Sequence, residues 1–229
     1  MNRSIFLIPF LFAHLLTAQT VSIQERFSQH YHTADSLTEA NQGQRALAYF
    51  DSCRISMADS AEYAYSLVRT ARTYDNIGKP DSALIFYSKA ESWVRDIGEK
   101  EPLSFFLLYR AFHLDRKREN ANSKRDLNEL LEFVSDDDYQ GAYLKSKSFQ
   151  TLAEFGLKTR KLDSSYYFIS KMNEYREKDP TKGIEPHHFN TMAWYYYLTR
   201  DLNYALKTLK EYFDWYKVEL KDMEPVHSG

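Results

Sequence analysis

Apolar residues recur at spacings of three and four along most of the chain, a pattern that predicts amphipathic helices with one buried face. The pattern is clearest in a stretch that reads LVRTARTYDNIGKPDSALIFYSKA and begins at Leu67. In its first half, Leu67, Ala71 and Tyr74 share one helical face. In its second half, an apolar stripe starts at Ala83, and it continues beyond the stretch through Trp93 and Val94. The stretch therefore predicts two helices whose apolar faces pack together.

A short polar segment, GKPDS, separates the two stripes. Glycine readily takes the left-handed conformation that ends a helix, so Gly78 is expected to close the first one. Asp81 or Ser82 can cap the second helix. Small residues such as Ala83 and Ala90 are expected where the two helices cross, because larger side chains would hold the backbones apart. The segment is therefore predicted to be a tight turn inside a helix hairpin.

The same arrangement returns along the chain. An interval of 37 residues separates Ala46 from Ala83, and an interval of 40 residues separates Ser165 from Ala205. The segment after Pro102 is assigned by its position, because its helix is apolar almost all round and lacks the repeated small residues. We therefore predict five hairpins, at 21–57, 60–97, 102–135, 139–177 and 186–219. The alternative is an irregular helical bundle.

The stretch from Leu67 resembles a tetratricopeptide repeat (TPR). The matching residues are Ala71, Tyr74, Gly78, Ala83, Tyr87 and Ala90. It departs from the family pattern at Thr70, where a large aliphatic residue is common. The resemblance implies an all-α, right-handed α-solenoid of about five TPR-like hairpins over residues 19–220, followed by a polar tail at 221–229.

The first eighteen residues have the layout of a secretory signal peptide. Arg3 gives a positive head, the apolar run 5–16 follows, and small residues end at Ala18. The alternatives are an uncleaved anchor and a buried core helix. The Ala18–Gln19 junction resembles those of exported proteins from Bacteroidota-like bacteria, which implies a periplasmic or secreted protein. No later segment is apolar enough to span a membrane.

Composition narrows the class of protein further. Seven glycines and six prolines in 229 residues argue against an all-β or loop-rich protein, and 16% aromatic residues argue against disorder. A formal charge of −2 gives no electrostatic case for binding nucleic acid or an anionic membrane. One cysteine cannot form an internal disulfide or a cysteine-rich metal site.

Candidate chemistry is sparse. The pairs His30/His32 and His187/His188 could bind a metal only with further ligands, so we interpret them as surface histidines. The acidic run 136–138 lacks the spacing of a calcium loop and is interpreted as favourable charge at a helix start. Neither a glycine-rich phosphate loop nor a serine nucleophile elbow occurs. We therefore predict no metal, no cofactor and no enzymatic activity.

In the TPR family, the first helix of each hairpin lines a concave groove that holds a protein or peptide partner. Carrying those positions over implies candidates in four hairpins: Tyr65, Val68, Arg72, Asp75 and Asn76; Leu108, Phe112 and Asp115; Gln150, Glu154 and Lys158; and Asn190, Trp194 and Tyr197. The alternative for the charged candidates is an ordinary solvated surface.

Surplus aromatic residues mark the last hairpin. Trp194 and Tyr197 lie beyond the predicted packing face, and exposed aromatic residues favour interfaces. The alternative is that a terminal helix or the C-terminal tail covers them. The last helix is also rich in aromatic residues, so its open edge either is sealed by the tail or meets a partner or a second copy.

The resemblance implies a non-catalytic scaffold or adaptor in the cell envelope that binds a protein or peptide in its groove. The alternative is a sensor arm of an envelope signalling system, because similar exported arrays precede a membrane span and a regulatory domain in some signalling proteins. That alternative requires a truncation or a separate partner. An enzyme is the most distant alternative.

Overall fold

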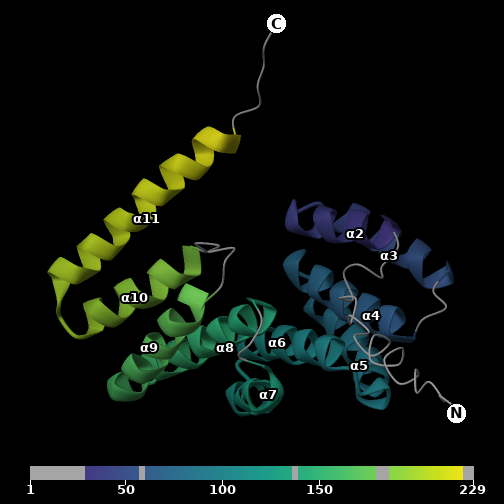
Figure 1. Cartoon of the computed structure of the whole chain (residues 1–229), viewed down its shortest axis with the longest axis horizontal. Coiled ribbons are helices and arrows are strands. Elements are labelled where there is room, and N and C mark those ends of the chain that lie inside the picture. The colour runs from purple at the N-terminus through teal and green to yellow at the C-terminus, as the bar shows by residue number, and fades with distance from the viewer. Residues whose placement is uncertain (1–28, 57–59, 136–138, 179–185, 224–229) are drawn as a thin grey trace, which may run out of the picture.

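The computed structural model describes residues 29–56, 60–135, 139–178 and 186–223, and every regular element in these ranges is an α-helix (Figure 1). The helices pair into five consecutive hairpins: α2 (Gln29–Glu39) with α3 (Gly43–Ser56), α4 (Ser60–Asn76) with α5 (Pro80–Ile97), α6 (Lys100–Arg116) with α7 (Asn120–Phe133), α8 (Tyr139–Lys158) with α9 (Leu162–Lys178), and α10 (Pro186–Leu198) with α11 (Leu202–Met223). This confirms the predicted all-α array of hairpins. The predicted signal peptide and the acidic run 136–138 lie outside the described residues.

All five hairpins turn in the same way. Each turn contains one residue with a positive φ angle: Asn41, Gly78, Arg118, Arg160 or Arg200. The backbone N–H of the next residue donates to a carbonyl five positions earlier, as Lys79 does to Tyr74 at 2.9 Å. Repeated turn geometry therefore sets a repeated angle between the two helices of each hairpin.

The core runs continuously through the first four hairpins. Ala71, Ala83 and Ala90 have no exposed surface, which confirms the close helix crossing predicted in the second hairpin. Helix α6 is buried on several faces, as its apolar sequence predicted, with Phe106 and Leu107 fully buried. Because each hairpin covers the apolar face of its neighbour, the buried residues form one large cluster from α2 to α8 and a smaller cluster between α8 and α9.

Three local expectations were wrong. Helix α5 begins at Pro80 with Lys79 as its N-cap and no side-chain cap, so Asp81 and Ser82 lie inside the first turn. Trp93, expected in the buried stripe, is exposed and packs edge-on against Tyr63, with ring centroids 4.8 Å apart. His188, expected at the surface, is only 6% exposed.

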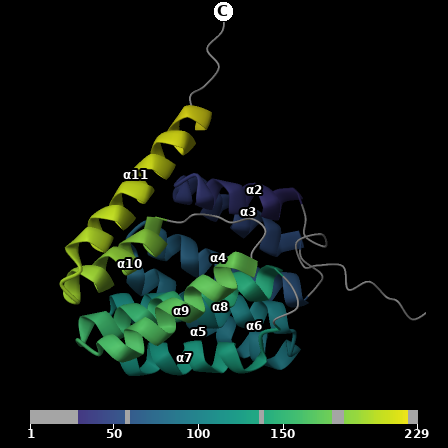
Figure 2. The ribbon, with the colours of Figure 1, turned by 60° about the vertical axis from the view of Figure 1, so that its left-hand side comes forward.

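The last helix stands apart from the rest of the array. Helix α11 packs along α10 at the end of the array opposite α2 and α3 (Figure 1), and it rises above the other hairpins (Figure 2). It continues to Met223, past the end predicted at residue 219. Among the described helices, its only extensive packing is against α10.

Candidate functional site

A cavity of about 610 Å³ lies along the first helices of four successive hairpins, α4, α6, α8 and α10. Its lining residues are Arg69, Arg72, Asn76, Tyr109, Phe112, Asp115, Arg116, Tyr143, Lys147, Gln150, Thr151, Glu154 and His187. We call this surface the groove. Because only first helices supply its walls, the groove lies on the side of the array where the sequence predicted a binding surface.

The lining follows the repeat. The positions of Arg72 and Phe112 are separated by 40 residues, those of Phe112 and Gln150 by 38, and those of Gln150 and Asn190 by 40. One turn earlier, Arg69, Tyr109, Lys147 and His187 follow the same three intervals. Since equivalent helices present equivalent positions to the groove, the hairpin geometry itself gathers these side chains into one surface.

Arg72 is the groove arginine that aromatic rings hold in place. Its guanidinium carbon lies 5.3 Å from the ring centroid of Tyr109 and 5.6 Å from that of Phe112. Such cation–π contacts hold the guanidinium in place while leaving N–H donors free in the plane. Within the described residues, no carboxylate lies within ion-pair distance of Arg72. An anionic group in the groove would therefore find a positioned and uncompensated donor.

Arg69 plays a different part at the α4 end of the groove. Its guanidinium forms an ion pair with Asp35 of α2 and donates a hydrogen bond to the Tyr109 hydroxyl at 2.7 Å. These contacts connect three hairpins. Arg69 is only 4% exposed, so it anchors the wall that carries Arg72.

The acidic residues of the groove are engaged with neighbouring helices. Both carboxylate oxygens of Asp115 lie 2.9 Å from Nζ of Lys158. Glu154 accepts a hydrogen bond from the hydroxyl of Thr191 at 2.9 Å and one from the amide of Gln150 at 3.3 Å. These bonds join α6 to α8 and α8 to α10. They fix the curvature of the groove and reduce the capacity of its carboxylates to bind a cation.

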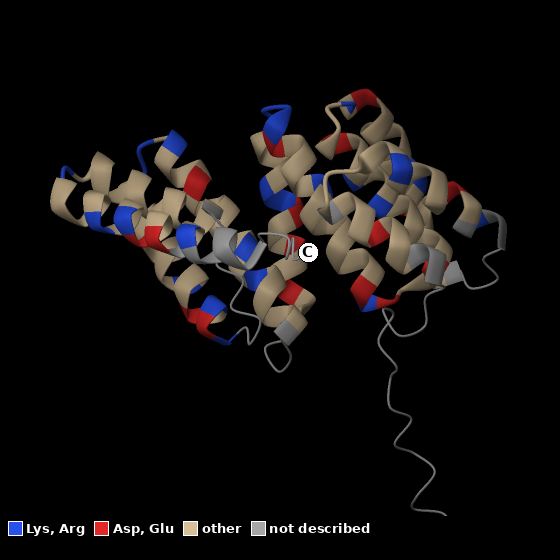
Figure 3. Cartoon of the chain, turned by 90° about the horizontal axis from the view of Figure 1, so that it is seen from above, with Lys and Arg blue, Asp and Glu red and all other residues tan. Residues whose placement is uncertain are grey.

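Charge in the groove is opposite in sign to that of the whole chain. Arg69, Arg72, Arg116 and Lys147 line it with Asp115 and Glu154, whereas the chain carries a formal charge of −2. Because Arg69 and Arg116 are paired with Asp35 and Asp75 behind the lining, the positive excess rests chiefly on Arg72. Over the described helices as a whole, both basic and acidic residues are spread through the array (Figure 3). The groove thus favours an anionic ligand.

A buried polar cluster lies behind the α4 and α6 walls. The ring Nδ1 of His113 lies 2.8 Å from Asp75, and the Tyr87 hydroxyl donates to the same carboxylate at 3.1 Å. Arg116 reaches Asp75 from the groove side at 3.5 Å. Burial, followed by the negative charge of Asp75, raises the pKa of Tyr87 well above its usual value. The cluster satisfies buried polar groups and orients Arg116 toward the groove.

The structure divides the sequence-predicted candidates into lining and core residues. Arg72, Asn76, Gln150 and Glu154 line the groove, and Lys158 lies beside it through its bond to Asp115. In contrast, Tyr65 is buried, with its ring 5.3 Å from that of Phe105. The remaining candidates on α4 and α6 also divide: Phe112 and Asp115 line the groove, and Val68, Asp75 and Leu108 are buried.

The candidates on α10 form one exposed row. His187, Asn190, Trp194 and Tyr197 follow each other at spacings of three and four and all are exposed. Trp194 is 37% exposed and Tyr197 is 64% exposed, so both present ring surface to solvent. The row begins at the groove, where His187 is part of the lining, and extends it along α10.

Sequence reasoning missed several lining residues, chiefly Arg69, Tyr109, Arg116, Tyr143 and Lys147. The third hairpin was assigned by its position and not by its motif, so its candidates included Leu108 in place of Tyr109, the next residue. Counting 40 residues forward from Arg69 and from Arg72 would have identified Tyr109 and Phe112.

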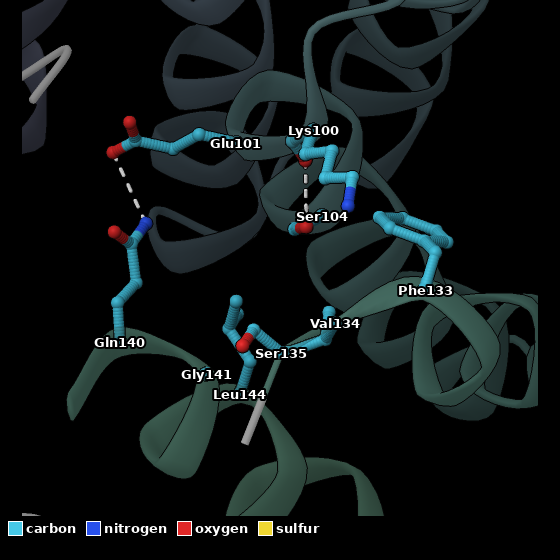
Figure 4. Close-up of a pocket in the computed structure, with 9 residues that line it drawn as sticks. All are labelled: Lys100, Glu101, Ser104, Phe133, Val134, Ser135, Gln140, Gly141 and Leu144. Atoms are coloured by element: carbon cyan, nitrogen blue, oxygen red, sulfur yellow. Dashed lines mark hydrogen bonds between the residues drawn. The ribbon is translucent and has the colours of Figure 1, made fainter. Parts of the chain in front are cut away.

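A second, smaller pocket offers little chemistry. It measures about 100 Å³ and lies where the start of α6 meets the end of α7 and the start of α8 (Figure 4). Gln140 donates to Glu101 at 3.0 Å, and the Ser104 hydroxyl donates to the carbonyl of Lys100 at 2.6 Å. Because that hydroxyl is used by its own helix, Ser104 has the contacts of a structural residue.

Metal clusters and membrane-spanning helices are both absent from the described ranges. No group of three or more His, Cys, Asp and Glu side chains there is arranged to hold a metal ion. None of the helices in those ranges has the length and apolarity needed to cross a membrane.

The fold matches solved structures of repeat proteins. The crystal structure of BtubC (BKLC) from P. vanneervenii has a TM-score of 0.62 and 14% identity, covering 86% of this chain and 81% of that one. Two structures of the TPR-like repeats of a kinesin-light-chain protein from Podospora anserina have TM-scores of 0.55 and 0.54. Their identities are 12% and 11%, and they cover 81% and 85% of this chain and 92% and 95% of theirs. The sequence matches no protein-family model and no curated protein. The fold is that of a TPR-like repeat solenoid.

Proposed function

We propose that the chain is a non-catalytic scaffold whose groove binds an acidic peptide segment of a protein partner. The observation that carries this proposal is Arg72, a cation held on two aromatic rings in the groove with no carboxylate partner among the described residues. A partner carboxylate would complete a charge-assisted hydrogen bond with a donor that is already in position.

The size and lining of the groove fit a peptide. Its volume of about 610 Å³ falls in the range of small-molecule and peptide-side-chain sites. The exposed row on α10 adds Trp194 and Tyr197 along the same line. Aromatic and arginine side chains are the usual anchors of protein interfaces. We therefore expect a partner segment with carboxylates near Arg72 and an apolar side chain near Trp194.

We also propose that the protein acts in the cell envelope. This part of the proposal is supported by the sequence of residues 1–18, with its positive head, apolar run and small residues before Gln19. The envelope would present the groove to periplasmic or secreted partners.

The groove can be tested with three fluorescein-labelled peptides of equal length: one acidic with one aromatic residue, one acidic without it, and one basic. Fluorescence anisotropy with the full chain measures their dissociation constants. We expect the acidic aromatic peptide to bind most tightly and the basic peptide to bind least. Arg72→Ala should weaken the binding of the acidic peptides about tenfold, which is the magnitude expected for the loss of one charge-assisted hydrogen bond.

Lys89→Ala provides a matched control. Lys89 also lies over an aromatic ring, 5.1 Å from the centroid of Phe86, but it lies on α5, outside the groove. We expect this variant to bind the peptides like the wild type. Equal affinity for acidic and basic peptides, or equal loss in the two variants, would show that the groove is not the binding site.

A further inference from the structure

Two neighbouring hairpin turns, α6–α7 and α8–α9, carry runs of basic side chains. The chain reads KRENANSKRD from Lys117 across the first turn and KTRKLD from Lys158 across the second. Lys and Arg occupy several loops along one edge of the array (Figure 3). In the sequence, acidic residues within these runs offset part of the positive charge. The contacts of each charge decide how much of it is left over.

Much of the acidic charge near the first turn is bonded to other helices. Asp126 has no exposed surface, and its two carboxylate oxygens accept from Arg110 of α6 at 2.6 and 2.9 Å. Glu129, three residues further along α7, accepts from Arg95 of α5 at 2.8 Å. Because these carboxylates already have partners, they do little to offset the cations of the turn.

Contacts between the two turns bring their basic residues side by side. Nζ of Lys158 lies 2.9 Å from both carboxylate oxygens of Asp115. The ring of Phe155 lies beside two cations: Nζ of Lys124 is 5.1 Å from its centroid and Nζ of Lys158 is 5.4 Å from it. The end of α8 therefore lies against both the end of α6 and the start of α7.

Four cations on these turns have no carboxylate of the described residues within ion-pair distance, and we call them the turn ridge: Arg118, Lys124, Arg160 and Lys161. Lys124 is half-buried and the other three are exposed. The exposed carboxylates among them are Asp163 and Glu119, which accepts from Asn122 at 3.1 Å. Positive charge therefore remains in excess after the internal ion pairs have formed.

The turn ridge continues the surface of the groove. Asp115 and Arg116 line the groove at the end of α6, and Arg118 follows two residues later. On α8, Glu154 lines the groove, and Arg160 lies just beyond the end of that helix. A segment that leaves the groove past the ends of α6 and α8 therefore passes over the ridge.

We propose that an acidic segment of the partner extends out of the groove and over the turn ridge. This extension depends on the proposed function of the groove and adds a second set of contacts to it. Carboxylates of the extension meet the four cations of the ridge, so none of the ion pairs described above has to break. Charges at such a rim act mainly on the rate of association and on its salt dependence.

The pattern of charge favours a polypeptide over a nucleic acid. Glu119 and Asp163 interrupt the cations once in each turn. A nucleic-acid strand is charged at every phosphate and would bring phosphates against these carboxylates, whereas an acidic polypeptide can place neutral residues there. Packed helices lie about 10 Å apart, and an extended chain advances about 3.3 Å per residue. Acidic residues about three positions apart therefore match the two turns.

The extension can be tested with the acidic aromatic peptide that probes the groove. Two longer peptides add about eight residues to it, with glutamate at every third position in one and glutamine in the other. Each extension is placed at the amino end in one set and at the carboxyl end in a second set, because a segment can enter the groove in either direction. Fluorescence anisotropy with the full chain measures the dissociation constants.

At one of the two ends, we expect the glutamate extension to bind about tenfold more tightly than the glutamine extension. This gain should shrink as salt is raised, because the ridge is exposed. Arg118→Gln combined with Arg160→Gln removes one cation from each turn and should abolish most of the gain.

Lys171→Gln combined with Lys178→Gln is the matched control, because it removes the same charge from the second half of α9, away from the turn. This double variant should keep the gain in full. Both double variants should keep the helical circular dichroism of the wild type, since all four side chains reach solvent. Arg72→Ala should weaken the glutamate and glutamine peptides by the same factor, because it acts in the groove.

Failure of the groove and failure of the ridge give different results. If the peptide without an extension does not bind, or binds Arg72→Ala like the wild type, both proposals are overturned. If Arg72→Ala weakens binding but the two extensions bind equally, or both double variants lose the gain alike, only the ridge proposal is wrong. An oligothymidylate of equal charge that binds the ridge more tightly than the glutamate peptide would assign it to nucleic acid and also overturn the proposal.

Discussion

Acidification should destabilise this fold through one buried histidine. His188 accepts a hydrogen bond at Nε2 from Nη1 of Arg176, 2.9 Å away, because a guanidinium can only donate. The neutral ring therefore carries its proton on Nδ1, which is buried without a hydrogen-bond partner. Protonation of Nε2 would break the bond to Arg176 and place two cations side by side at the contact between α9 and α10.

The magnitude follows from the pKa. Burial, followed by the positive charges of Arg176 and Lys147, lowers the pKa of His188 from 6.5 to about 4. Between those two values the unfolded chain binds a proton at this residue and the folded chain does not. Stability should therefore fall as the pH is lowered from about 6.5 to about 4, with no further loss from this group below that. The difference in pKa corresponds to about 3 kcal/mol.

The assay is urea denaturation, followed by helical circular dichroism, at about pH 7 and about pH 4 for the wild type and His188→Gln. Glutamine can still accept from Arg176 but does not titrate. Titratable groups other than His188 contribute equally to the loss of stability between the two pH values in both proteins. The difference between the loss in the wild type and the loss in the variant therefore comes from His188. We expect the wild type to lose about 3 kcal/mol more than the variant. The same loss in both proteins would refute the assigned burial and protonation of His188.

Two further predictions concern packing and location. A Cβ added at Gly156 would collide with the Ser165 hydroxyl across the α8–α9 crossing, so Gly156→Ala should lower the free energy of unfolding by about 1–3 kcal/mol in urea denaturation. Ser165→Ala added to that variant should restore part of the lost stability, whereas additive losses from the two substitutions would contradict the collision. If residues 1–18 are a cleaved export signal, the protein purified from its native cells should have the mass of a chain that begins at Gln19. The mass of the full-length chain would argue for an uncleaved segment.

The hairpins could be predicted because their apolar stripes are local in sequence. The turns could not be predicted equally well. All five place one residue in the left-handed conformation, but only the second uses the glycine that signals it. Arg118, Arg160 and Arg200 adopt the same conformation at a small energetic cost that the packed helices impose. The turn could therefore be predicted from its glycine in only one hairpin, although all five hairpins share the turn geometry.

The site was predictable only in part, for a related reason. The side on which the groove lies follows from the repeat, and Arg72, Gln150 and Glu154 were found that way. Burial depends on neighbours that are distant in sequence. Tyr65 is buried because α6 brings Phe105 against it, and His188 is buried beside Arg176 of α9 while adjacent His187 stays exposed.

The most direct test of the central claim is to locate a bound peptide on the full chain. An acidic peptide that carries a nitroxide label broadens the amide resonances of nearby residues in the NMR spectrum. We predict broadening along the groove face of α4, α6, α8 and α10, around Asn76, Phe112 and Glu154, with α5, α7 and α9 unaffected. Broadening confined to the second helices, or none when the peptide is saturating, would contradict the claim that the groove is the binding surface.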